Sequence, residues 1–275
     1  MRPLFDTKIL DRYKNRAQPH IQDHNFLFQW VMEDIENRLS FIKRDFDHYL
    51  HLDVRAPFLP HKNGHIPDII PSADQSTQQL DAPPLSQDLI IAPLCLHSLN
   101  DLPGMLFQIK QALKPDGLFI GAVFGQETLR ELRESLQQTE IDLYSGMHPR
   151  VHPFIHMQQM GDLLQRAGFT LPVIDSEIIT VQYSSLTKLC HDLRFMGEGC
   201  ALSERSKHFS ARRLFEQAQE YYQKHFSNSD GLLNASFEII FISGWAPSNH
   251  QQKPLKPGSA TARLSDILKT SEEKL

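Results

Sequence analysis

Residues 88–125 read DLIIAPLCLHSLNDLPGMLFQIKQALKPDGLFIGAVFG. Two apolar runs, 88–95 and 118–124, flank a segment whose apolar residues recur at helical spacing, and this order predicts a βαβ unit. Both runs are almost continuously apolar, which is typical of parallel strands that helices cover on both faces. The stretch therefore predicts the centre of an α/β domain with a doubly wound, Rossmann-like sheet.

The segment Lys114-Pro115-Asp116-Gly117 predicts where the helix of this unit ends. Proline cannot continue a helix, because its ring clashes with the preceding turn and it has no N–H group to donate. Gly117 is expected to take the positive φ angle that a helix end or a tight turn requires.

Charge and cysteine content exclude several classes of protein. The net charge is −5 and the 28 basic residues are dispersed, so we expect no nucleic-acid surface. Cys95, Cys190 and Cys200 are an odd number without disulfide or zinc-site spacing, which predicts free thiols, no metal site and a reducing, cytoplasmic location. No export signal and no apolar run of ~18 residues is present, so we expect no stable membrane insertion.

The chain divides into three predicted parts: an N-terminal helical cap at 1–48, an α/β domain at 49–247 and a polar C-terminal arm at 248–275. The cap carries one apolar stripe, which we expect to pack on its own domain as a lid. The stripe consists of Leu27, Val31, Ile35, Leu39 and Ile42. Further strands are expected at 49–54, 65–70, 171–183 and 235–245, and further helices at 126–140, 155–167, 186–196 and 212–226.

Residues 55–87 interrupt the expected alternation of strands and helices. Six prolines and the turn dipeptide Asn63-Gly64 fall here, and only the polar segment 72–80 offers a helix. A full βαβ unit needs ~30 residues or more. We therefore predict that the first βαβ unit is abbreviated.

Three segments carry a resemblance to a known family. They are LCLHSLNDLPGMLFQIKQALKPDGLFIGAVFGQETLRELRESL at 94–136, DLLQRAGFTLPV at 162–173 and GWAPSNHQQKPLKPGSA at 244–260. The chain resembles class I S-adenosylmethionine-dependent methyltransferases of the biotin-synthesis type. It is most similar to the branch that contains the respiratory complex I assembly factor described as a protein-arginine hydroxylase.

The resemblance makes the segment 49–247 a methyltransferase-like domain. It implies a seven-stranded sheet whose last strand, here Ala235 to Trp245, is antiparallel. It also implies S-adenosylmethionine as cofactor and a complex I subunit as partner.

The stretch that should hold the cofactor departs from the family pattern. Members of the family place an acidic, glycine-rich loop after the first strand, where missing side chains let the backbone approach the cofactor. Here residues 51–57 read HLDVRAP and contain no glycine. The acid that would hold the ribose hydroxyls aligns with Asp68, although a turn-forming aspartate between prolines explains Asp68 equally well.

Other candidate residues follow the strand at 88–95, at the edge of the sheet where ligands of such folds bind. We expect Leu94 beside the cofactor site, and His97 either touches a substrate as a general base or is a loop histidine bonded to backbone, which we favour slightly. His148, His152 and His156 lie close together in sequence, but no carboxylate shares their spacing. We expect structural or surface roles for these three.

Two hypotheses follow, and residues 51–80 separate them. In one, the protein is an enzyme that transfers a methyl group or assists a hydroxylation on a protein or a small carboxylate. In the other, the cofactor site is degenerate and the protein is a binding or assembly factor for a complex I subunit. The sequence favours the second hypothesis and leaves the oligomeric state open.

Overall fold

The computed structural model describes residues 3–53, 55, 68–69, 78–207, 210–252 and 259. Its centre is a sheet in the order β2-β1-β3-β4-β6-β5. The strands are β1 (Tyr49–His51), β2 (Asp68–Ile69), β3 (Gln87–Pro93), β4 (Leu113–Phe124), β5 (Thr170–Tyr183) and β6 (Leu233–Trp245). β1 to β4 pair in parallel, and β6 is antiparallel to both β4 and β5. The predicted α/β class and the antiparallel last strand are confirmed, with six strands in the described residues where the resemblance implies seven.

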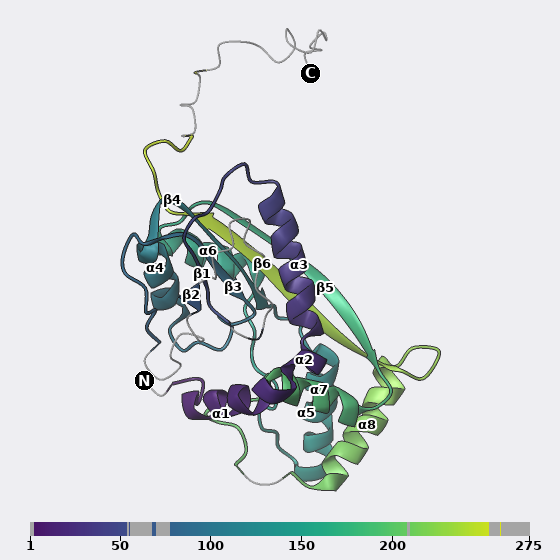
Figure 1. The fold of residues 1–275 in the computed structure, drawn as a ribbon. Coiled ribbons are helices and arrows are strands. Elements are labelled where there is room, and N and C mark those ends of the chain that lie inside the picture. The colour runs from purple at the N-terminus through teal and green to yellow at the C-terminus, as the bar shows by residue number, and fades with distance from the viewer. Residues whose placement is uncertain are drawn as a thin grey trace, which may run out of the picture.

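Helices surround this sheet on two faces and at one end (Figure 1). They are α1 (Thr7–Ala17), the 3₁₀ turn η1 (Gln18–His20), α2 (Ile21–His24), α3 (Phe26–Ser40), α4 (Leu102–Ala112), α5 (Arg130–Tyr144), α6 (Met157–Ala167), α7 (Leu186–Met196) and α8 (Arg212–Phe226). α1, α2, α5, α7 and α8 gather beyond one end of the sheet, whereas α3 runs along one face (Figure 1). In the described part of the chain, no helix has the length and apolar content needed to cross a membrane.

Alternate residues of the central strands point to two separate apolar cores. Leu89 and Ile91 of β3 face the core that includes α3, whereas Ile90 and Ala92 face the core that includes α4 and α6. Strand side chains alternate between the two faces of a sheet, so a strand buried on both faces must be apolar throughout. This explains why the strands of segment 88–125 read as continuous apolar runs.

The segment 114–117, which lies in the first part of β4, differs from the expectation. The helix ends at Ala112 as predicted, but the positive φ belongs to Asp116, at 64°, and not to Gly117. Gly117 is required by close approach instead, because a Cβ there would lie 2.9 Å from the carbonyl oxygen of Lys114. The predicted end of the helix is therefore confirmed, whereas the prediction of a positive φ at Gly117 is wrong.

The N-terminal helices pack on their own domain, as the apolar stripe predicted. Leu27, Val31 and Ile35 of α3 are fully buried in the core. The ring of Trp30 lies 5.8 Å from the ring of Phe241 on β6, centroid to centroid. α3 therefore covers one face of the sheet.

Several predicted boundaries shift. β1 ends at His51, before the expected limit at 54, and α5 begins at Arg130, four residues after its expected start. The backbone of Leu129 takes a φ of 54°, which delays the helix. The proposed helix at 72–80 lies outside the described residues except for 78–80, which are not helical, and the arm at 248–275 lies outside them except for 248–252 and 259. All three cysteines are free.

Candidate functional site

The sheet changes direction between β1 and β3. The chain moves outward from β1 to β2 and then returns to the other side of β1 to form β3. In open α/β sheets, ligands bind outside the carboxyl ends of the strands at such a switch point. Asp53 and Arg55 follow β1, and Leu94 and His97 follow β3, so all four converge on this position.

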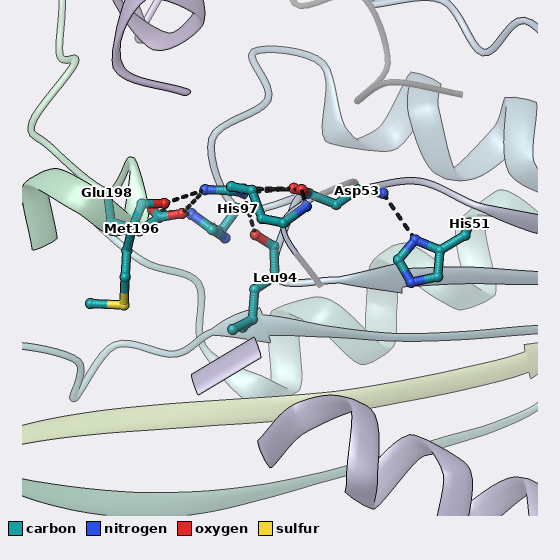
Figure 2. Close-up of polar contacts among 7 residues, drawn as sticks. His51, Asp53, Leu94, His97, Met196 and Glu198 are labelled. Atoms are coloured by element: carbon teal, nitrogen blue, oxygen red, sulfur yellow. Dashed lines mark hydrogen bonds and ion pairs between the residues drawn. The ribbon is translucent and has the colours of Figure 1, made fainter. Parts of the chain in front are cut away.

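Four charged or titratable side chains form what we call the switch-point cluster: Asp53, Arg55, His97 and Glu198. A terminal nitrogen of Arg55, Nη2, lies 2.7 Å from Oδ2 of Asp53, and Nη1 lies 2.6 Å from Oε1 of Glu198. The other Glu198 oxygen lies 2.9 Å from Nε2 of His97. Figure 2 shows the Asp53 and Glu198 carboxylates apart from each other in this row of contacts, with His97 bonded to Glu198. All four side chains have less than a tenth of their surface exposed.

The Arg55 guanidinium is saturated with acceptors. Besides the two carboxylates, it donates to the backbone carbonyl of Met196 at 3.1 Å and to that of Leu94 at 3.0 Å. Its Nε donates to Asp53 at 3.0 Å, so all five N–H groups point at acceptors. The ring of Phe28 packs against it, 4.8 Å from the guanidinium carbon to the ring centroid. A fully paired guanidinium in this environment is fixed in place.

Local sequence explains how the two carboxylates reach Arg55. Oδ1 of Asp53 accepts the Arg55 backbone N–H at 2.8 Å, which folds the chain back over its own aspartate. At the other side, Gly197 ends α7 with a φ of 82°, where a larger residue is strained. Glu198 follows directly and turns into the switch point.

A second cation approaches the cluster from α1. The Lys14 ammonium is buried and has no hydrogen-bond partner among the described residues. Burial lowers the pKa of Lys14, and the nearby Arg55 lowers it further, whereas Asp53 and Glu198 oppose the shift. The cluster and Lys14 together hold two carboxylates and three basic groups, which are Arg55, His97 and Lys14.

The ionisation states follow from these contacts. Burial alone raises the pKa of Glu198, but His97 and Arg55 outweigh it and hold that pKa well below its usual range. Burial also opposes ionisation of Asp53, whose pKa is nevertheless lowered by Arg55 and Lys14. For Arg55, the effect of burial is exceeded by the two carboxylates, which raise its pKa. Both acids are therefore ionised and Arg55 is charged at neutral pH.

Among the described residues, the acceptors of the switch-point cluster that could hold S-adenosylmethionine are already bonded. S-adenosylmethionine carries a sulfonium, an ammonium and a carboxylate group, and its two cationic groups need anionic or carbonyl partners. Here the carboxylates of Asp53 and Glu198 and the carbonyl of Leu94 are already bonded to Arg55. A sulfonium or ammonium group placed beside Arg55 would find these acceptors already engaged, which is unfavourable in a low-dielectric site.

The three predicted site residues do not all lie together in the structure. Leu94 and His97 lie at the switch point, but the Leu94 carbonyl is bonded to Arg55 and its side chain is fully buried. His97 bonds a carboxylate and not the backbone, which corrects the favoured interpretation. Asp68 lies in β2 in register with Leu50, and its side chain is outside the described residues.

Sequence reasoning missed Arg55, Glu198 and Lys14. The signal for Arg55 was present, because a charged pair with Asp53 directly after a buried strand needs internal partners. Glu198 is 143 residues away from Arg55, and no local pattern connects the two.

The loop histidines have the structural role that was predicted, at least for His152. Its side chain is buried and its Nε2 accepts the backbone N–H of Ala201 at 2.8 Å. Burial lowers the pKa of His152 to about 4, so the ring is neutral at physiological pH. In the described part of the chain, His148, His152 and His156 do not gather into a metal-binding group.

A cavity of about 270 Å³ adjoins the cluster at Glu198. Its walls are mostly apolar and come from the sheet, from helices α1, α5, α7 and α8 and from the loop before α6. They include Phe124, Leu129, Phe154, Leu193 and Phe237, with Arg150 among the polar lining residues. The cavity is suited to an apolar or aromatic side chain.

Comparisons with known proteins agree with this fold. A family model described as a methyltransferase domain matches residues 20–172. The rat protein named mitochondrial arginine-hydroxylase NDUFAF5 is 34% identical over 295 residues, covering 98% of this chain and 85% of the rat protein. The Dictyostelium discoideum protein of the same name is 41% identical over 187 residues, covering 68% of this chain but only 43% of that protein. A malonyl-[acyl-carrier protein] O-methyltransferase of Xylella fastidiosa is 36% identical over 164 residues, covering 60% of this chain and 53% of that enzyme.

Proposed function

The chain belongs to the methyltransferase-domain family that includes arginine-hydroxylase NDUFAF5 and malonyl-[acyl-carrier protein] O-methyltransferase, and we propose that it acts as a protein-binding assembly factor with a degenerate cofactor site. In this proposal the switch point serves stability instead of cofactor binding. The methyltransferase fold then supplies a scaffold, since a fold does not by itself fix a function.

One observation carries the proposal: the switch-point cluster uses the groups that a cofactor needs. Arg55 takes both carboxylates and the Leu94 carbonyl, with each contact at 3.0 Å or less. The absence of glycine at 51–57 adds independent support, because the backbone there carries side chains where the family leaves space.

The proposed partner is a subunit of respiratory complex I. The similarity to the rat arginine-hydroxylase over most of both chains supports this choice. The apolar cavity beside Glu198 supports a binding role, because it offers a recess for a partner's side chain. The chain spans 43% and 56% of the Dictyostelium discoideum and Danio rerio relatives, so their activities are transferred here only as a proposal.

We propose a reducing, cytoplasmic location, which the three free cysteines support. The relatives from rat and Dictyostelium discoideum are named as mitochondrial, which makes the mitochondrial interior the competing location. Fractionation of cells that express the tagged chain distinguishes the two.

The first test is isothermal titration of the purified chain with S-adenosylmethionine and with S-adenosylhomocysteine. Mass spectrometry of the denatured protein first establishes that neither compound copurifies, and the Xylella fastidiosa enzyme serves as the positive control. We expect no heat and no thermal stabilisation at millimolar ligand. A micromolar Kd, about −8 kcal/mol, would refute the degenerate site and favour the methyltransferase or hydroxylase alternative.

The second test addresses the assembly role in cells that lack the gene. We expect complex I, measured on native gels, to recover with the wild-type chain and equally with Asp68→Ala and His97→Gln. Both variants must first be shown by circular dichroism to be folded at the temperature of the assay. Failure of a normally folded variant to restore complex I would support the enzyme alternative, in which these side chains hold cofactor or move a proton.

A further inference from the structure

Two histidines and an aspartate meet where α2 contacts α7. They are His24 at the end of α2 and the neighbours His191 and Asp192 on α7, and one ligand atom from each lies within 4.8 Å of the other two. Nδ1 of His24 is 2.8 Å from Oδ1 of Asp192. The three residues converge although His24 and Asp192 are 168 positions apart in the sequence.

The donor set matches the preferences of zinc and related divalent transition metals. Zinc takes imidazole nitrogens and carboxylate oxygens at about 2.0–2.2 Å, commonly with three protein ligands and one open position. Tetrahedral ligands at that distance are about 3.4 Å apart. The His24 and Asp192 atoms, 2.8 Å apart in a hydrogen bond, would separate slightly to admit an ion, and the His191 imidazole would move closer from within the 4.8 Å that spans the three atoms.

The surroundings orient the imidazoles and leave access for an ion. The Phe195 ring lies 4.4 Å from His191 and 5.1 Å from His24, centroid to centroid. The His24 and Asp192 side chains are 18% and 27% exposed, and His191 is exposed. The group is therefore reachable from solvent while one wall is packed.

We propose that His24, His191 and Asp192 bind a divalent transition metal of the zinc class, with water in the fourth position. The ion would fasten α2 to α7 and act as a structural clamp on the N-terminal helices. This inference is independent of the proposed function, because it concerns residues outside the switch-point cluster. It also departs from the sequence-based expectation of no metal site, which rested on spacing alone.

The test uses untagged chain freed of metal with a chelator. Titration with Zn²⁺ is expected to show one tight equivalent, and Co²⁺ is expected to give the intense visible absorption of a tetrahedral site. His24→Ala and His191→Ala should each weaken binding at least 10-fold. His225→Ala, which removes an exposed histidine of α8, should leave the affinity unchanged and is the matched control.

Measurements of Tm with and without Zn²⁺ give a second readout of metal binding if His24→Ala folds poorly. His24 bonds Asp192, so His24→Ala changes the metal-free protein, whereas His191 is exposed and its removal should leave the fold intact. Zn²⁺ is expected to raise the Tm of the wild type and of His225→Ala but not that of His191→Ala. Absence of a stoichiometric site, or equal Zn²⁺ affinity in the wild type and His191→Ala, would overturn the assignment.

Discussion

Replacing Arg55 with alanine tests whether the switch-point cluster stabilises the fold. The change removes five N–H donors, leaves the ionised Asp53 buried without its principal partner, and leaves Glu198 bonded to His97 alone of its two basic partners. Removing one partner of a buried ion pair typically costs about 3–5 kcal/mol, because the remaining charge is uncompensated. Lys14 lies close enough to influence both acids, so we expect the lower end, about 3 kcal/mol.

The assay is equilibrium urea unfolding at pH 7, followed by circular dichroism. A total stability of about 5–15 kcal/mol makes a loss of this size readily measurable. The matched control is Arg212→Ala, which breaks the exposed pair between Arg212 and Glu216 and should change stability by no more than about 0.5 kcal/mol. If Arg55→Ala lowers the free energy of unfolding by no more than Arg212→Ala does, the switch-point cluster does not stabilise the fold.

A triple variant separates lost charge balance from lost packing. Asp53→Asn, Arg55→Met and Glu198→Gln together remove all three charges while keeping similar volumes. Replacing a buried ion triad by hydrophobic groups of similar volume is often close to neutral in stability, and the neutral amides used here likewise leave no unpaired carboxylate. We therefore expect the triple variant to be more stable than Arg55→Ala alone, and the opposite order would contradict the electrostatic explanation.

Three further predictions concern other parts of the fold. His152 has a folded pKa of about 4 against an ordinary 6.5, so its contribution to stability is present above pH 6.5 and is lost as pH falls towards 4. The difference of about 2.5 pH units corresponds to about 3 kcal/mol. The His152→Gln variant should therefore show a smaller change of unfolding free energy between pH 6.5 and pH 4. Gly121→Ala should cost about 1–3 kcal/mol in urea unfolding, because its Cβ would lie 2.8 Å from the Ala92 carbonyl oxygen on the adjacent strand. Glu131→Ala should lower the Tm, since the buried carboxylate accepts from the backbone N–H and the hydroxyl of Ser236, and Glu131→Gln should restore part of the loss.

The sequence predicted the centre of the sheet well for a physical reason. Strands covered on both faces must be apolar on both faces, and the two strand runs of segment 88–125 are almost continuously apolar. α7 and α8 were also predicted at the residues where they occur, because their apolar stripes have clear limits. Local signals were sufficient wherever local packing decides the structure.

The candidate site was harder to predict because its contacts are long-range. Arg55 bonds Glu198 across 143 positions, and His24 bonds Asp192 across 168. Periodicity and motif spacing report on neighbours along one element and carry no information about such pairs. Prediction therefore identified the edge of the sheet and His97, but not the guanidinium that occupies that edge.

The proposed metal group and the surroundings of the switch-point cluster both involve α7 and the N-terminal helices. Metal binding should therefore affect the stability of variants of the cluster. α7 carries His191 and Asp192 and leads directly into Glu198, while the N-terminal helices supply Lys14 and His24. A ligand that binds only the folded state stabilises it, by about 2.7 kcal/mol at 100 times its Kd. Zn²⁺ should therefore offset most of the loss in Arg55→Ala, and the same addition should fail once His191→Ala is combined with it. Rescue that persists in the double variant would mean that the ion acts elsewhere on the chain.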